Sequence, residues 1–207
     1  YYEDGSIEYE GDYKNGTGQI IGYHKNREIK FIRNDINGKI EGEIFRYSEE
    51  GEIRGKGNFR NGTGEWRQHY DNGEILEIRR LRLGMLSGEQ ADYYDNGQIK
   101  VIFFAKDDNY HGEYIAYYES GSISQKGFYK DGYLDGEWTT YFENGMIERV
   151  ENYKDGVLHG KVFYGSEHRK KIVSMYYYKD GVKHGEYFED DSGPREAIKG
   201  LYKYGYR

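Results

Sequence analysis

The sequence predicts an all-β chain, an elongated and twisted antiparallel array of about eight β-hairpin repeats of about 24 residues each. Three observations support this fold class. Glycines recur at a fixed interval, Asn-Gly and Asp-Gly pairs recur with them, and the segments between are rich in aromatic and β-branched residues. A single array is therefore expected over residues 1–207, cut within a repeat at both ends.

The repeat period is read from two sets of glycines. The glycines that open the repeat motif fall 22 to 25 residues apart, at Gly18, Gly42, Gly64, Gly88, Gly112, Gly136, Gly160 and Gly185. A second set keeps the same interval at Gly51, Gly73, Gly97, Gly121 and Gly145, and resumes at Gly193. Such periods are typical of arrays in which each unit buries its apolar groups only against its neighbours.

The repeat that opens at Gly136 shows the elements in order. Residues 137–142 are aromatic and β-favouring, which predicts a strand. Asn144 and Gly145 follow, and Asn-Gly supplies the positive φ angles of a tight hairpin turn. Residues 147–153 predict the second strand, and Lys-Asp-Gly at 154–156 predicts the turn into the next hairpin.

Helices are a poor alternative, because 30 glycines at intervals of 8 to 12 residues would interrupt any helix of useful length. The single proline, Pro194, is expected at an edge or a turn. The repeat pattern departs at residues 79–83, which lack Asp-Gly, and at residues 164–171, where the hairpin turn has lost its glycine.

Side chains alternate across a strand, so the repeat positions can be sorted by face. Counted from the motif glycine, positions two and six share one face, which is taken as the packed one. They hold Ile44, Trp66, Tyr114, Trp138, Val162 and Tyr187, and Tyr70, Tyr94, Tyr118 and Phe142. Phe45 and Ile115 fall on the other face, so a strictly one-sided core is not required.

The opposite face carries an acidic and tyrosine-bearing row. Position one is glutamate in most repeats, with Lys161 as the exception, and position five is usually tyrosine. Tyrosine gives large contact area at small entropic cost, and glutamates favour a basic partner. The candidate partner-binding residues are Tyr47, Tyr93, Tyr117, Tyr141, Glu89, Glu113 and Glu137.

The composition argues against several functions. The net charge of -7 opposes nucleic-acid binding and association with anionic lipid. No cysteine is present, and no stretch approaches the roughly 20 apolar residues of a membrane span. The chain begins with Tyr1, which suggests that an N-terminal signal or anchor has been removed, and a bacterial exported or surface location is favoured over a cytoplasmic one.

The sequence predicts no enzyme, cofactor or metal site. Catalysis needs groups that converge in a shielded pocket, whereas an array places equivalent residues at regular separations on an open surface. His111, His159 and His184 each occupy the slot before a motif glycine, and a turn-flanking role is the better interpretation of them. Asp107, Asp108 and Asn109 lack the alternating ligands of a calcium loop.

The motifs resemble MORN repeats, and more closely the bacterial variant found in proteins labelled as toxin–antitoxin antitoxins. The resemblance covers nearly the whole chain. It rests on Gly-Glu-Trp at 64–66 and 136–138, on Tyr-Tyr or Tyr-Phe before Asn-Gly, and on Lys-Asp-Gly at Lys130, Lys154 and Lys179. The resemblance implies hairpins in an elongated sheet that acts in protein assembly, sometimes near membranes.

The leading functional hypothesis is a noncatalytic scaffold for protein–protein interaction. One alternative is a carbohydrate- or cell-envelope-binding array, since exposed aromatic rings beside carboxylates suit sugar faces. Another, implied only by the resemblance, is an antitoxin that neutralises a protein toxin. End-to-end self-association is also expected, because the terminal strands of an open sheet present unpaired edges.

Overall fold

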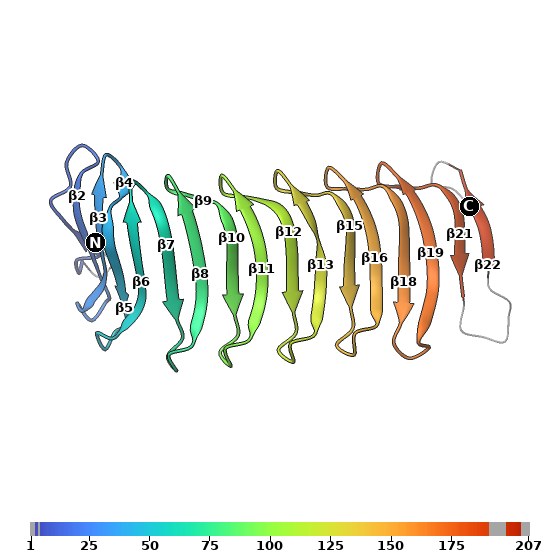
Figure 1. Cartoon of the computed structure of the whole chain (residues 1–207), viewed down its shortest axis with the longest axis horizontal. Coiled ribbons are helices and arrows are strands. Elements are labelled where there is room, and N and C mark those ends of the chain that lie inside the picture. The colour runs from blue at the N-terminus through green and yellow to red at the C-terminus, as the bar shows by residue number, and fades with distance from the viewer. Residues whose placement is uncertain (1–2, 4, 191–197, 204–207) are drawn as a thin grey trace. The chain divides into compact units, whose positions relative to one another are not determined.

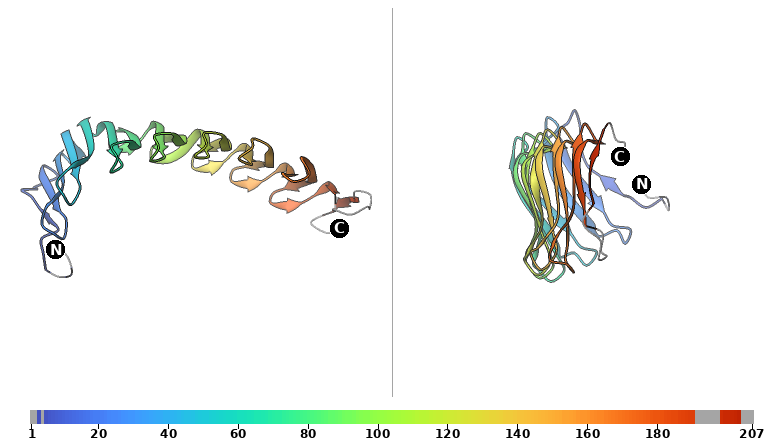
Figure 2. Two further views of the ribbon diagram at one scale, coloured as in Figure 1. Left: turned by 90° about the horizontal axis from the view of Figure 1, so that it is seen from below. Right: turned by 90° about the vertical axis from the view of Figure 1, so that its right-hand side faces the viewer.

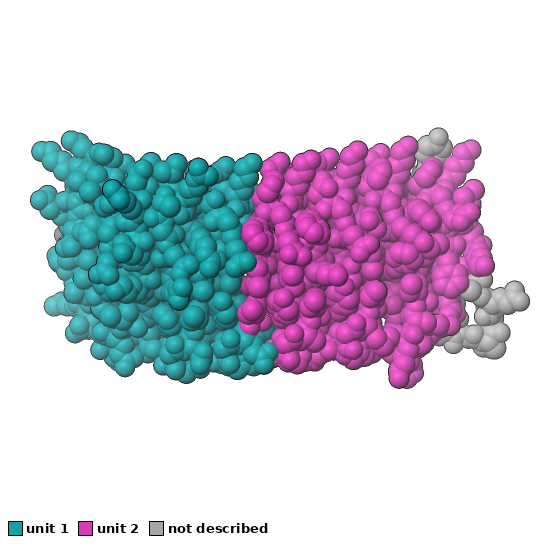
Figure 3. Space-filling view, viewed as in Figure 1, with its two compact units in different colours: residues 1–98, 105–109 teal, residues 99–104, 110–207 magenta. Residues whose placement is uncertain are grey.

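The computed structural model describes residues 3, 5–190 and 198–203, and all of its regular elements are β-strands. Gly193 and Pro194 lie outside the described residues. The chain divides into two compact units (Figure 3), Tyr1–Gln98 with Ala105–Asn109, and Ile99–Phe104 with Tyr110–Arg207. We call them unit 1 and unit 2. Consecutive hairpins follow one another in chain order within each unit (Figure 1).

Unit 1 consists of long hairpin strands with two-residue strands between some of the hairpins. They are β1 (Tyr9–Glu10), β2 (Gly18–Tyr23), β3 (Ile29–Ile36), β4 (Lys39–Ile40), β5 (Gly42–Tyr47), β6 (Ile53–Arg60), β7 (Thr63–His69), β8 (Ile75–Arg82), β9 (Met85–Leu86) and β10 (Gly88–Tyr93). The next strand, β11 (Ile99–Lys106), contributes residues to both units.

In unit 2 a two-residue strand lies between each hairpin and the next. Its strands are β12 (Asn109–Tyr117), β13 (Ile123–Lys130), β14 (Tyr133–Leu134), β15 (Gly136–Tyr141), β16 (Ile147–Lys154), β17 (Val157–Leu158), β18 (Gly160–Ser166), β19 (Lys171–Lys179), β20 (Val182–Lys183), β21 (Gly185–Glu189) and β22 (Ile198–Tyr202). The first residue of β12, Asn109, is counted with unit 1.

The predicted antiparallel hairpins are confirmed. In the repeat at Gly136, β15 pairs with β16 so that Trp138 lies opposite Glu151 and Thr139 opposite Val150. The register shifts between Thr140 and Tyr141, which leaves one extra residue on β16. The same shift occurs in β2–β3, β5–β6, β7–β8, β12–β13 and β18–β19, so the bulge is part of the repeat.

Of the two glycine turns of the repeat, the Asp-Gly turn has the expected geometry and the Asn-Gly loop does not. Positive φ at both central residues marks the Asp155-Gly156 turn, at 50° and 79°, as type I′. In the Asn144-Gly145 loop only the glycine is left-handed, with φ of 82°. Asn144 instead accepts a hydrogen bond at Oδ1 from the Met146 amide at 2.9 Å. The expectation of positive φ at Asn144 was therefore wrong, because its side chain closes the loop without it.

The irregular repeats keep these turns with other residues. Leu83 adopts φ of 56° before Gly84, although its β-carbon disfavours that region. Asp107 and Asp108 have φ of 49° and 65° in the equivalent turn, and Lys170 has φ of 53° in the loop that lacks a glycine. The repeat tolerates these residues because the paired strands on both sides fix the turn.

Neighbouring repeats are joined at the type I′ turns. In unit 2 the turn glycine of one repeat donates to a carbonyl of the preceding repeat, from Gly132 to Tyr110 at 2.9 Å and from Gly156 to Leu134 at 2.8 Å. Gly181 donates to Leu158 in the same way at 2.9 Å. Each turn therefore stacks on the turn before it.

The repeat between Gly42 and Gly64 is shorter than the others and lacks a two-residue strand. Elsewhere the residue before the motif glycine bulges out, as Asp135 does, and the glycine that follows has positive φ, which is 92° at Gly136. In the short repeat Thr63 pairs directly with Arg60, and Gly64 is not left-handed. The 22-residue spacing is the sequence signature of this simpler turn.

Within each unit the sheet is one layer, and no described element covers either face (Figure 2). Burial therefore comes from side chains of neighbouring strands. Of the residues predicted at position two of the packed face, Trp138, Val162 and Tyr187 are buried. The other three, Ile44, Trp66 and Tyr114, are half-buried. Thr139 and Val150, which pair with each other, are buried on the opposite face. Their side chains are short, and the longer side chains around them on that face cover them. The core of unit 2 is thus divided between the two faces.

Candidate functional site

The predicted glutamates lie on the surface, as their exposure shows. Glu89, Glu113 and Glu137 are all exposed. Glu89 lies 3.4 Å from the Arg80 guanidinium, and Glu137 accepts a hydrogen bond from Thr139 at 3.4 Å. Exposed pairs of this kind contribute at most about 1 kcal/mol to stability. The carboxylates therefore remain accessible to a partner.

The predicted tyrosines are half-buried, and their backbones take part in the repeat junctions. The carbonyl oxygens of Tyr47, Tyr93 and Tyr141 accept hydrogen bonds from the position-six side chain of the preceding repeat. The donors are His24 at 3.0 Å, Tyr70 at 2.8 Å and Tyr118 at 2.6 Å, in that order. The structure thus fixes the backbone that carries these rings.

A row of isoleucines beside the predicted tyrosines was missed by the sequence reasoning. Ile123 lies opposite Tyr117 and Ile147 opposite Tyr141, so each pair shares one face of the sheet. Ile123 is 37% exposed and Ile147 is 45% exposed. We call these four residues the Tyr–Ile surface of unit 2. The Gly-x-Ile spacing of the second glycine set was the available signal.

The Tyr–Ile surface continues into other exposed groups of the same face. Phe128 lies opposite Glu113 and is 54% exposed. Lys126 places its ammonium 5.9 Å from the centre of the Tyr141 ring. Apolar, aromatic and charged side chains are thus interleaved on this part of unit 2.

The opposite face of unit 2 carries an aromatic cluster that is structural. The Trp138 ring centre lies 5.2 Å from that of Tyr114 and 5.6 Å from that of Tyr129. Gly127 lies beneath the indole, where a β-carbon would come within 2.4 Å of Trp138 Cε3. The rings pack over a strand that has no side chain at that point, which explains a glycine outside any turn.

Two half-buried tyrosines of unit 2 have raised pKa values. Burial raises the pKa of Tyr153 to about 12, and the neighbouring Glu151 carboxylate acts in the same direction. Burial also raises the pKa of Tyr176, whose hydroxyl donates to Glu189 at 2.7 Å. In both cases the fold favours the neutral phenol.

Alkaline solution is therefore expected to destabilise unit 2. The contribution of a group with a raised pKa is complete below the unfolded-state pKa of about 10 and is lost as the pH rises toward the folded value. The melting temperature, followed by circular dichroism, should fall between about pH 10 and about pH 12. Tyr153→Phe should reduce this fall, whereas Tyr133→Phe, at a ring that is 63% exposed, should not. Equal pH profiles for both variants would contradict the assignment.

The histidines at the slot before the motif glycine face the turn of the next repeat. His111 Nδ1 lies 3.2 Å from the Asp131 carboxylate, and His159 Nδ1 lies 3.3 Å from that of Asp180. Thr63 in the same slot accepts a hydrogen bond from the Leu83 amide at 3.1 Å. Over the described residues no group of three potential metal ligands occurs. These contacts agree with the predicted turn-flanking role.

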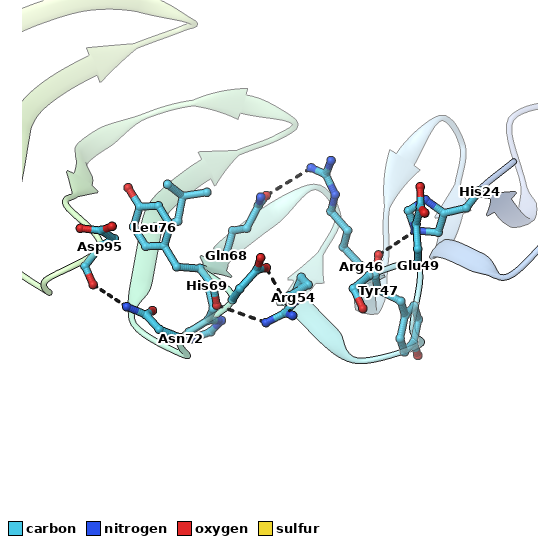
Figure 4. A pocket seen from close by; sticks show the side chains of 13 residues that line it. His24, Arg46, Tyr47, Glu49, Arg54, Gln68, His69, Asn72, Leu76 and Asp95 are labelled. Carbon is cyan, nitrogen blue, oxygen red and sulfur yellow. Dashed lines mark hydrogen bonds and ion pairs between the residues drawn. The ribbon is translucent and has the colours of Figure 1, made fainter. Parts of the chain in front are cut away.

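Unit 1 contains an open cavity of about 630 Å³ near the ends of its hairpin loops. Figure 4 shows Arg46, Arg54, Gln68 and His69 around it, with Tyr47 at one side. Arg46 donates to Gln68 at 3.2 Å across the cavity wall. Tyr47 is the one predicted site residue that lines it.

Comparison with known families identifies the repeat. A family model for the MORN repeat variant matches residues 1–15, 37–61, 86–107, 110–131 and 134–155, about half of the chain. The protein is an all-β hairpin repeat protein, and it belongs to the MORN repeat variant family. MORN repeats are noncatalytic and commonly serve as binding or scaffold repeats. No curated protein matches the chain. No described helix could span a membrane.

Proposed function

We propose that this protein is a noncatalytic scaffold that binds a protein partner through the Tyr–Ile surface and the adjoining glutamates. The observation that carries this proposal is the recurrence of exposed isoleucine beside tyrosine, at Ile123 and Ile147. Isoleucine occupies this position in both repeats although its side chain is 37% to 45% exposed. Burial within the fold alone does not explain why the position is apolar. Large rigid rings beside aliphatic groups are typical of the contact centres of interfaces.

The charge of the partner follows from the same face. Glu113 and Glu137 lie at the motif's first position, and both are exposed. They would attract a partner with basic side chains. Their main effect would be on the orientation in which the partner binds, and their effect on the binding affinity would be smaller. A partner segment with aliphatic groups flanked by lysine or arginine fits this arrangement.

Carbohydrate binding and toxin neutralisation are the two alternative functions. Carbohydrate binding would use exposed indole rings, but Trp138 is only 9% exposed beneath its tyrosine neighbours. An antitoxin would be one form of the proposed protein binding. Its test is a toxic gene next to this one whose effect is removed by co-expression, and growth arrest despite co-expression would exclude it for that gene.

Charged substitutions on the Tyr–Ile surface are expected to abolish partner capture. The double variant Ile123→Glu with Ile147→Glu should weaken binding at least tenfold, because each carboxylate would be desolvated against an apolar contact. The measurement is quantitative mass spectrometry of proteins cross-linked to the intact chain in a lysate of its source organism.

The matched control is Val182→Glu, at a residue 49% exposed in the short strand β20. It adds a carboxylate at similar exposure away from the Tyr–Ile surface. A partner retained by this control and lost by the double variant supports the proposal. Equal retention by both variants, with unchanged melting temperatures, would exclude the Tyr–Ile surface as the interface.

A further inference from the structure

The cavity of unit 1 lies where one repeat differs from its neighbours at position six. Tyr70 and Tyr118 occupy this position in two other repeats, and each hydroxyl donates to the position-five carbonyl of the next repeat. His24 makes the same contact in the first repeat, with Tyr47. In these three repeats position six is therefore filled by a ring that bridges to the next repeat.

Ser48 is the residue at position six beside the cavity. Its hydroxyl is turned toward its own loop, where it accepts hydrogen bonds from the Glu50 amide at 3.2 Å and the Glu52 amide at 3.3 Å. Ser48 is too short to bridge to the next repeat as those rings do, and it lines the cavity. The Arg54 guanidinium contacts the next repeat there instead, through the Tyr70 carbonyl. The carbonyl that corresponds to the acceptors of Tyr70 and Tyr118 is that of His69, and His69 lines the cavity.

The walls of the cavity suit a ring better than an anion. Arg54 already contacts the Glu52 carboxylate at 2.7 Å and the Asp71 carboxylate at 3.3 Å, and it donates to the Tyr70 carbonyl at 3.3 Å. The lining also holds Glu49, Asp71 and Asp95, so its carboxylates outnumber its two arginines and oppose an added anion. Guanidinium groups bonded through their edges still offer flat faces for stacking on an aromatic ring.

The size and remaining lining of the cavity agree with this. Its volume of about 630 Å³ exceeds that of one tyrosine side chain, so the cavity has room for a tyrosine ring. Leu76 and Tyr47 supply apolar contact, and Arg46 and Gln68 form a bonded pair in the wall (Figure 4).

We propose that this cavity binds a tyrosine side chain of a partner polypeptide, in the place that a tyrosine of the chain itself fills in neighbouring repeats. The partner's phenol donates to the His69 carbonyl, and its ring lies against Arg46, Arg54 and Leu76. The site goes beyond the proposed scaffold interface, because it is formed by unit 1 alone and uses none of the Tyr–Ile surface.

The test is an NMR titration of the isotope-labelled full chain with N-acetyl-tyrosinamide. The arginine Nε–H signals and the amides of residues 46–54 and 68–72 should shift saturably, with a dissociation constant in the range of about 1–10 mM for so small a probe. N-acetyl-phenylalaninamide should bind several-fold more weakly, because it has no hydroxyl to donate to the carbonyl.

Two variants based on another loop of the chain test whether the cavity is the binding site. Ser48→Tyr with Glu50→Asn converts residues 48–51 to the Tyr-x-Asn-Gly loop of residues 70–73, which fills the cavity from within. This variant should lose the probe-induced shifts and keep a dispersed native spectrum. Glu50→Asn alone leaves the cavity open and should bind as the unaltered chain does.

Three results would overturn the proposal. They are the absence of saturable shifts in the unaltered chain, equal binding by the folded double variant, and shifts at the same residues with sodium acetate that compete with the tyrosine probe. The last result would make the cavity an anion site. Each can be obtained whether or not the Tyr–Ile surface binds a partner.

Discussion

Trp138→Ala is expected to be among the most destabilising substitutions in unit 2, with a loss of about 3–5 kcal/mol in the free energy of unfolding. The indole is 9% exposed and lies between Tyr114 and Tyr129. The strand beneath it has Gly127 at the contact point, so no other side chain can fill the space that the substitution leaves. Urea unfolding followed by circular dichroism measures the loss.

Phe128→Ala is the control for this prediction. Phe128 is another aromatic residue of unit 2, but it is 54% exposed on the face opposite the indole. Its removal should cost less than about 1 kcal/mol, because most of its surface is already in water. If the two substitutions cost the same, the aromatic cluster is not the main source of stability in unit 2.

Gly64→Ala is expected to disrupt the pairing of β6 with β7, at a cost of about 3 kcal/mol or more. A β-carbon at Gly64 would lie 2.1 Å from the backbone oxygen of Asn58 on the adjacent strand. A backbone atom cannot rotate aside as a side chain can, so the strands would have to separate. Urea unfolding and the amide exchange rates of β6 and β7 report this effect.

Gly42→Ala tests whether the cost comes from the close approach or from the motif glycine as such. Gly42 occupies the same motif position with φ of 75°, and a β-carbon there would meet nothing within 4 Å. Only the left-handed conformation is penalised, so the expected cost is about 1 kcal/mol. Equal losses at the two glycines would show that steric contact with Asn58 does not decide the outcome.

Much of the fold could be predicted from the sequence because the repeat fixes its own local contacts. The hairpins, the type I′ turns at Asp-Gly and the burial of position two all follow from residues close together in the chain. The exposed glutamates at position one also follow from strand alternation. Long-range information was needed for none of these features.

The remaining features depend on groups that meet across strands. The role of Gly127 can be predicted only if Trp138 is known to lie over it. The alternation of side chains within one strand does not show which residue of the neighbouring strand lies there. The Asn144 loop was mispredicted because Asn-Gly serves two turn types, and here the Asn144 side chain accepts from the Met146 amide and closes the loop. The isoleucines of the Tyr–Ile surface were missed because the faces were sorted for only one strand of each hairpin.

The stacked type I′ turns of unit 2 have a consequence for how the gene can change. The bonds from Gly132, Gly156 and Gly181 each reach back only one repeat, to Tyr110, Leu134 and Leu158. A tandem duplication of one whole repeat within unit 2 would therefore give every added turn the same partner as before. Gains and losses of complete repeats can adjust the length of the unit without compensating mutations elsewhere. A frame-preserving deletion of part of a repeat would instead leave the turn at the junction without its matching carbonyl.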